Sequence, residues 1–192
     1  ISLSHLTKTK EFEDSCRIQL NNASLNLTRK GVDGIMDVIR IGIVGASGRG
    51  RMAKHWHNEN QKRSKVVAAM DVSRESLDEF KANINSNAYV TQDLNDLLSR
   101  EDIDAIAIFS PDFCHEEQVI AAFKAGKDVF CEKPMAITTQ GCDEMLRAWK
   151  ASGRKFMIGH NMRYMPFVRT MKEIIDSGVI GEIKTVWCRH FI

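Results

Sequence analysis

One stretch decides the fold: Met36-Asp37-Val38-Ile39-Arg40-Ile41-Gly42-Ile43-Val44-Gly45-Ala46-Ser47-Gly48-Arg49-Gly50. The apolar run over 38–44 predicts a buried strand. The turn that follows matches the pattern G-x-G-x-x-G at its first and last positions, and Ser47 replaces the middle glycine. In such a turn Gly45 allows the tight bend and Gly50 allows close packing of a helix. The stretch therefore predicts a strand, a turn and a helix in immediate succession.

The rest of the chain repeats this alternation of a short apolar run with an amphipathic helical segment. The alternation is typical of βαβ units, which form a parallel sheet with helices on both faces. Strands are predicted over 38–44, 65–70, 89–91, 105–109, 128–131 and 156–158. The predicted fold class is therefore α/β, with a doubly wound parallel sheet of the Rossmann type.

Several polar and glycine residues mark the predicted helix ends. Ser73 and Asp93 stand where N-caps are expected, and Gly126 and Gly153 stand where two helices should stop. These two helices are predicted over 116–125 and 140–151. A further helix is predicted over 166–177. The alternating segment 182–191 predicts a strand, for which the sequence offers no partner.

The chain divides into three regions by composition. Residues 1–35 show no sustained apolar period and are rich in Asn, Ser, Thr and Lys, so we expect a leader with no core of its own. On this hypothesis Met36 is the natural start. Residues 36–160 are predicted to form the Rossmann domain. Residues 161–192 are predicted to form a linker helix and the first strand of an incomplete second domain.

The glycine turn also predicts a dinucleotide site, because N–H groups at a helix start face a pyrophosphate with the helix dipole behind them. Asp71 closes the second predicted strand 21 residues after Gly50. Its carboxylate can accept hydrogen bonds from ribose hydroxyls, which favours NAD. Ser73 and Arg74 could instead hold a 2′-phosphate, so NADP stays open, and Asp71 could simply cap the next helix. The candidate cofactor residues here are Gly45, Ala46, Ser47, Gly48, Arg49, Gly50, Asp71, Ser73 and Arg74.

Two more polar loops follow predicted strands, at the sheet edge where ligands bind. Ser110-Pro111 leads to His115 near a helix start, where the helix dipole disfavours imidazolium, so we expect a neutral residue in the wall of the site or one without function. Glu132-Lys133-Pro134 follows the fifth strand. A lysine there can relay protons, although a solvated turn is the plainer interpretation of the triplet alone.

Composition argues against several classes of protein. A net charge of +2, with mixed signs along the chain, gives no extended positive potential that would bind nucleic acid or a membrane surface. The five cysteines include no C-x-x-C pair, which favours reduced thiols in a cytoplasmic protein and no metal site. Cys131 ends an apolar strand and is expected to be inert packing rather than a nucleophile.

The order of these features resembles the glucose-fructose oxidoreductase and inositol dehydrogenase family over about Met36 to the C-terminus. The resemblance implies that Lys133 lies beside the nicotinamide and the substrate hydroxyl. It also implies that Glu132 lines the cofactor pocket and that Asn161 and Arg163 lead toward the substrate. The matching features are the glycine turn, Asp71, Ser110-Pro111 with His115, Ala125-Gly126-Lys127, Glu132-Lys133-Pro134 and residues 159–163.

The resemblance implies an NAD(P)-dependent oxidoreductase that transfers hydride between the nicotinamide and a secondary hydroxyl or carbonyl of a sugar, polyol or similar small molecule. Lys133 would be catalytic. Family members carry a second α/β domain that supplies an Asp and a His, and the sequence stops at Ile192, so we expect part of the active site to be missing. The full-length protein is expected to be a homo-oligomer. A non-catalytic dinucleotide sensor and an inactive truncated fragment are the alternatives.

Deleting residues 1–35 should leave both the cofactor affinity and the melting temperature unchanged, because the segment is predicted to lie outside the fold. Titration with NAD and thermal denaturation of the shortened chain check this. A large loss of either quantity would contradict the assignment of Met36 as the start.

Overall fold

The computed structural model describes residues 38–57 and 63–189, so the predicted leader over 1–35 lies outside the described residues. The strands form one parallel sheet in the order β3-β2-β1-β4-β5-β6. This order confirms the predicted doubly wound sheet, and each strand begins and ends within one residue of its prediction. The strands are β1 (Ile39–Val44), β2 (Ser64–Met70), β3 (Tyr89–Thr91), β4 (Ala105–Ile108), β5 (Asp128–Cys131) and β6 (Phe156–Ile158).

Helices connect the strands, and their ends confirm the predicted caps. The Ser73 side chain accepts a hydrogen bond from Ser76 N at 3.2 Å, and Asp93 accepts one from Asn95 N at 2.7 Å. Gly153 ends its helix in the left-handed conformation, with φ of 65°. The helices are η1 (Gly48–His55), α2 (Arg74–Asn83), α3 (Leu94–Leu98), η2 (Asp112–Cys114), α4 (His115–Lys124), α5 (Thr139–Ser152), η3 (Asn161–Tyr164) and α6 (Pro166–Asp176).

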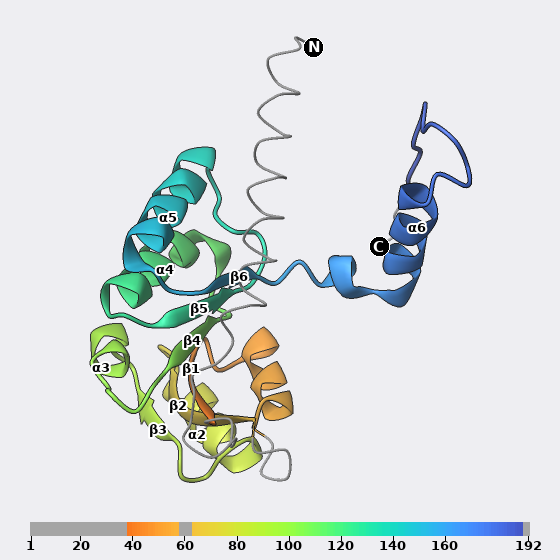
Figure 1. Cartoon of the computed structure of the whole chain (residues 1–192). Coiled ribbons are helices and arrows are strands. Elements are labelled where there is room, and N and C mark those ends of the chain that lie inside the picture. Colours follow the sequence, from red (N-terminus) through yellow and green to blue (C-terminus); the bar gives the residue numbers. More distant parts are fainter. Residues whose placement is uncertain (1–37, 58–62, 190–192) are drawn as a thin grey trace, which may run out of the picture.

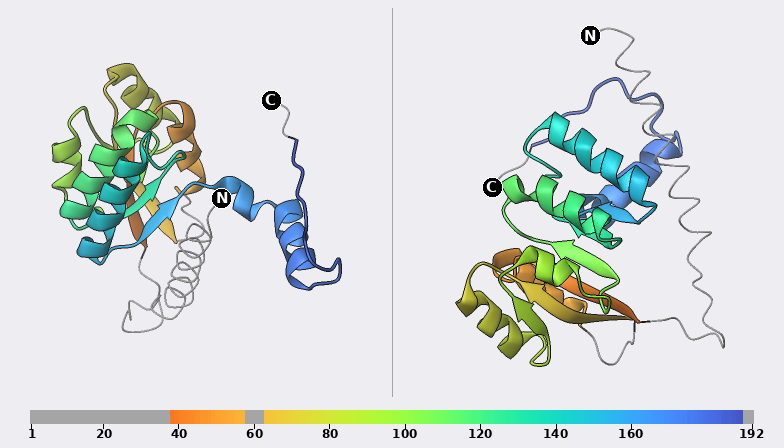
Figure 2. Two further views of the ribbon diagram at one scale, coloured as in Figure 1. Left: turned by 90° about the horizontal axis from the view of Figure 1, so that it is seen from above. Right: turned by 90° about the vertical axis from the view of Figure 1, so that its left-hand side faces the viewer.

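The helices that precede β6 form two layers, one on each face of the sheet (Figures 1 and 2). Helices α4 and α5 pack over the β4–β6 half, where Ile108, Val119 and Met145 are fully buried in one apolar cluster. On the other face, Leu77 and Phe80 of α2 join a second cluster. Because the chain runs from β1 outward in both directions, β1 and β4 flank the switch point of the sheet. Ligands bind at the carboxyl ends of strands beside such a point.

A polar network holds the opposite, amino-terminal edge of the sheet together. Arg40 in β1 donates to both Asp104 carboxylate oxygens, at 3.0 Å and 2.9 Å. The buried Lys127 ammonium donates to the carbonyl oxygens of Arg100 and Ile103, at 2.6 Å and 2.9 Å. Burial lowers the pKa of Lys127. The two side chains therefore tie the starts of β1, β4 and β5 together, away from the edge where ligands bind.

The region after β6 departs from the prediction. Helix α6 forms as predicted, but it stands away from the sheet in both figures and contains no buried residue. The strand predicted over 182–191 is wrong for residues 182–189, which form no strand. A strand needs a ladder of hydrogen bonds with a neighbour, and no described segment pairs with these residues.

The N-cap of α5 gives a test of how this layer is held. Thr138 accepts a hydrogen bond from Gly141 N at 2.9 Å. Removing it in Thr138→Ala should lower the free energy of unfolding by about 0.5–2 kcal/mol, measured by denaturant titration. The neighbouring, exposed Thr139→Ala is the matched control and should change it by less than about 0.5 kcal/mol. Equal effects of the two substitutions would contradict the capping role.

Candidate cofactor and substrate site

Two glycines fix the shape of the turn after β1. Gly45 has φ of 84°, and a Cβ added there would lie 2.8 Å from Ser110 N. A Cβ added at Gly50 would lie 1.9 Å from the carbonyl oxygen of Gly45. Any side chain at either position would therefore collide with backbone. Gly48 has φ of 48° but open space around it, so only its conformation favours glycine.

The turn leads directly into the start of a helix. Helix η1 begins directly after Ser47, and it is a 3-10 helix rather than an α-helix. The Ser47 side chain is exposed and makes no capping hydrogen bond, so its hydroxyl faces outward beside the helix start. Backbone N–H groups at such a start bind anions well. The absence of a Cβ atom at Gly48 leaves open space beside this helix start.

Asp71 ties the end of β2 to the glycine turn. Its buried carboxylate accepts hydrogen bonds from the backbone N–H groups of Ala46 at 2.8 Å, Ser47 at 3.3 Å and Ser73 at 2.9 Å. Asp71 does not cap α2, because Ser73 is the N-cap of that helix. The two bonds of Asp71 to the turn were not revealed by sequence spacing. An ionised carboxylate has about four lone-pair sites, so it keeps capacity for a ribose hydroxyl.

The side chains that could hold a 2′-phosphate are engaged within α2. The Ser73 hydroxyl oxygen caps the helix. Arg74 pairs with Asp78 one turn further along, at 3.3 Å, with both side chains largely exposed. An exposed pair of this kind is weak, but it directs Arg74 along the helix.

The loop after β4 is held from behind by the first turn of α4. The Ser110 hydroxyl donates to Gln118 Oε1 at 2.5 Å, a partner that sequence reasoning missed. His115 is 1% exposed. Its Nδ1 lies 2.8 Å from Pro134 O and its Nε2 lies 3.0 Å from Ser110 O. The ring is therefore beneath the loops, whereas Pro111 is exposed at their surface.

The loop after β5 places its charged residues in different surroundings. Glu132 is half-buried, and its Oε2 accepts a hydrogen bond from Lys133 N at 3.0 Å. The Lys133 side chain is exposed, and the Lys133–Pro134 peptide bond is cis. Gly159 directly follows β6. A Cβ added there would lie 3.1 Å from the Phe130 ring in β5 and 3.5 Å from Cα of Glu132 in the loop. The loop is thus anchored at Glu132 while the lysine amine is accessible.

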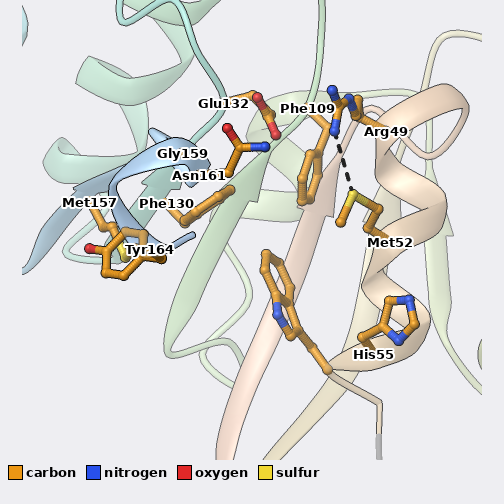
Figure 3. Close-up of a pocket in the computed structure, with 11 residues that line it drawn as sticks. Arg49, Met52, His55, Phe109, Phe130, Glu132, Met157, Gly159, Asn161 and Tyr164 are labelled. Atoms are coloured by element: carbon orange, nitrogen blue, oxygen red, sulfur yellow. Dashed lines mark hydrogen bonds between the residues drawn. The ribbon is translucent and has the colours of Figure 1, made fainter. Parts of the chain in front are cut away.

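A pocket of about 260 Å³ lies between η1 and the ends of β4, β5 and β6. Trp56, Phe109 and Phe130 form its aromatic floor, with ring centroids 5.3–5.8 Å apart. Figure 3 shows Glu132 and Asn161 pointing toward one another on one side, with Arg49 across from them. The lining residues are Arg49, Met52, His55, Trp56, Phe109, Phe130, Glu132, Met157, Gly159, Asn161 and Tyr164.

The pocket brings together three of the predicted site residues, Arg49, Glu132 and Asn161. Lys133, Asp71 and Arg163 are not among its lining residues. The aromatic floor was missed by sequence reasoning, although a bulky ring at the end of each of two adjacent strands was a visible signal. Neighbouring parallel strands align such rings on the same face.

The sequence is similar to known proteins over the region that forms the sheet and its helices. Residues 39–160 match the family model for oxidoreductases with an NAD-binding Rossmann fold, the model of glucose-fructose oxidoreductase and inositol dehydrogenase relatives. The chain belongs to this family. Inositol 2-dehydrogenase of Pseudomonas savastanoi pv. phaseolicola is 35% identical over 153 residues, which are 79% of this chain and 46% of that protein. The family resemblance drawn from the motifs is therefore confirmed.

Two further family relatives bear on the chemistry. The 2,7-anhydro-N-acetylneuraminate hydratase of Mediterraneibacter gnavus is 46% identical over 94 residues, which are 49% of this chain and 25% of that protein. The crystal structure of scyllo-inositol dehydrogenase from Lactobacillus casei, with bound NAD(H) and scyllo-inositol, superposes with a TM-score of 0.70 at 32% identity. That match covers 76% of this chain and 43% of the other. The chain thus spans less than half the length of these relatives.

The described part of the chain lacks the features of two other classes of site. It contains no cluster of three or more His, Cys, Asp or Glu side chains that could hold a metal ion. None of its helices combines the length and the apolar character that a membrane crossing requires.

Cys131, beside Glu132, has the properties of a buried packing residue and not those of a nucleophile. Burial, with a smaller contribution from the Glu132 charge, raises the pKa of its thiol to about 12. Because alkylation needs the thiolate, Cys131 should resist iodoacetamide at pH 8. It should gain reactivity only as the pH approaches the raised pKa of its thiol. The exposed Cys188 is the internal control and should be alkylated at pH 8. Peptide mapping by mass spectrometry measures both, and equal labelling of the native protein would contradict this assignment.

Proposed function

We propose that the protein is an NAD-dependent oxidoreductase that oxidises a secondary hydroxyl of a sugar, polyol or similar small molecule, or runs the reverse reduction. The observation that carries the proposal is the meeting of three loops at one edge of the sheet. These are the glycine turn after β1, Asp71 after β2 and the Glu132-Lys133-Pro134 loop after β5, with an aromatic-floored pocket between η1 and β5.

Each loop has a chemical task in this proposal. The backbone N–H groups of Gly48 and Arg49, which Asp71 does not engage, bind the pyrophosphate, and Asp71 accepts hydrogen bonds from the adenosine ribose. A nicotinamide dinucleotide supplies the carbon that accepts or returns hydride. Lys133 donates a hydrogen bond to the substrate oxygen and relays its proton. Asn161 and Arg163, in η3, hold the substrate's other hydroxyl groups.

NAD is the proposed cofactor in preference to NADP. Asp71 brings a negative charge to the end of β2, where a 2′-phosphate would be repelled. Arg74, whose positive charge could offset this repulsion, pairs with Asp78 in α2, and the Ser73 hydroxyl caps that helix. The solved relative with bound NAD(H) agrees with this choice.

A second candidate function is a hydratase or a related reaction without net oxidation. It is favoured by the 46% identity to the 2,7-anhydro-N-acetylneuraminate hydratase over 94 residues of the chain. The two candidates differ in a simple observable. A dehydrogenase accumulates NADH in proportion to the product, whereas a hydratase consumes its substrate without net NADH.

The Lys133→Ala substitution tests the catalytic role in the protein expressed with all of its natural sequence. Turnover of a cyclic polyol should fall about 100-fold or more, because a proton relay is lost. The dissociation constant for NAD, measured by calorimetry, should change by less than about threefold. The exposed Lys150→Ala in α5 is the control and should leave both quantities unchanged.

The outcomes separate the candidates. Unimpaired turnover in Lys133→Ala would falsify the lysine's role. NAD binding without turnover of any polyol or sugar would favour a dinucleotide sensor. A wild-type protein that binds NADP more tightly than NAD would overturn the cofactor proposal alone.

A further inference from the structure

The buried His115 has no task in the chemistry proposed above. It is the first residue of α4, its side chain is 1% exposed, and it lies beneath the two loops after β4 and β5. Its two ring nitrogens both face backbone carbonyl oxygens, Pro134 O at 2.8 Å and Ser110 O at 3.0 Å. A buried ring of this kind cannot touch a ligand at the surface, so any effect on the site must pass through the two loops.

The two oxygens belong to loops that are far apart in sequence but adjacent in the sheet. Ser110 follows β4, and Pro134 follows β5 directly after Lys133. Strands β4 and β5 are hydrogen-bonded up to the pair Ile108 and Cys131. Glu132 N also donates to Ile108 O at 2.9 Å. Beyond this point the ladder ends, and His115 is the next described link between the loops.

The link is rigid because both of its ends are held. His115 is fixed by helix α4, whose Ala122 and Phe123 are buried in the core. The same first turn holds Ser110 a second time, through its hydroxyl bond to Gln118. A neutral imidazole donates to one of the two carbonyl oxygens, and only the protonated ring donates to both. In either state at least one of the two carbonyl oxygens accepts a hydrogen bond from the ring.

We propose that His115 is a positioning residue, which fixes the Lys133-Pro134 loop relative to the Ser110-Pro111 loop by bridging the carbonyl oxygens of Pro134 and Ser110. The consequence for Lys133 rests on the proposed function. Because Pro134 is the next residue, release of its carbonyl lets the Lys133 backbone shift. Displacement of a catalytic group by about 1 Å can cost on the order of 100-fold in rate.

The test compares three variants of the protein with all of its natural sequence. His115→Phe keeps a ring of similar size and removes both polar contacts. His115→Gln keeps a donor nitrogen, whose N–H groups can reach one of the two carbonyl oxygens. Val119→Ala is the matched control, because it removes buried volume from the same helix but no polar contact to either loop.

Hydrogen–deuterium exchange without cofactor measures the bridge directly. Amides of residues 131–137 should exchange about tenfold faster in His115→Phe than in the wild type. His115→Gln should show a smaller increase, and Val119→Ala should show none in this segment. If His115→Phe does not fold, the Gln variant decides. Wild-type exchange over 131–137 in the decisive variant would overturn the proposal.

Kinetics then test the consequence for Lys133. The turnover number of His115→Phe should fall about 10-fold to 100-fold, while the dissociation constant for NAD changes by less than about threefold. Partial recovery in the Gln variant is expected, as is a turnover number in Val119→Ala close to that of the wild type. Equal losses in His115→Phe and Val119→Ala would reduce His115 to a packing residue and overturn the proposal. Faster exchange in a protein whose wild type turns over nothing would leave the bridge standing and reject only the proposed function.

Discussion

The close approach of Gly50 to the carbonyl oxygen of Gly45 is the constraint on which the rest of the structure depends. A methyl group at Gly50 would lie 1.9 Å from that oxygen, so the start of η1 can meet the end of β1 only because glycine has no side chain. The contact brings η1 over the sheet and its N–H groups to the carboxyl edge. It also brings Arg49 and Met52 to the pocket shared with β5 and β6.

Much of the fold follows from short-range patterns in the sequence. Apolar runs located all six strands, and Ser73, Asp93 and Gly153 located helix ends, because these signals depend only on neighbouring residues. The strand predicted beyond Glu182 failed for the opposite reason. Alternation shows that a segment could pair, but pairing requires a neighbour that the pattern cannot supply.

The site was predictable in its components but not in their contacts. The motifs indicated which loops meet at the carboxyl edge. They could not show that Asp71 accepts two hydrogen bonds from the glycine turn, or that the His115 ring faces inward to Ser110 and Pro134. The bonds of Asp71 to the turn and of His115 to Pro134 join residues 19 to 25 positions apart, and they depend on burial that no local pattern encodes. The supporting side chains thus lie in the interior, beneath the exposed ones that face a ligand.

The bonds of Asp71 restrict how this scaffold could change its coenzyme during evolution or by engineering. Replacing the acid is the obvious route to acceptance of a phosphorylated ribose, yet the same carboxylate satisfies backbone donors in the turn. Losing it leaves those donors unpaired, at a cost of about 1–3 kcal/mol for each that stays buried. A change of preference that retains Asp71 and frees Arg74 from its partner in α2 avoids that penalty. Coenzyme choice and turn integrity are therefore coupled through a single side chain.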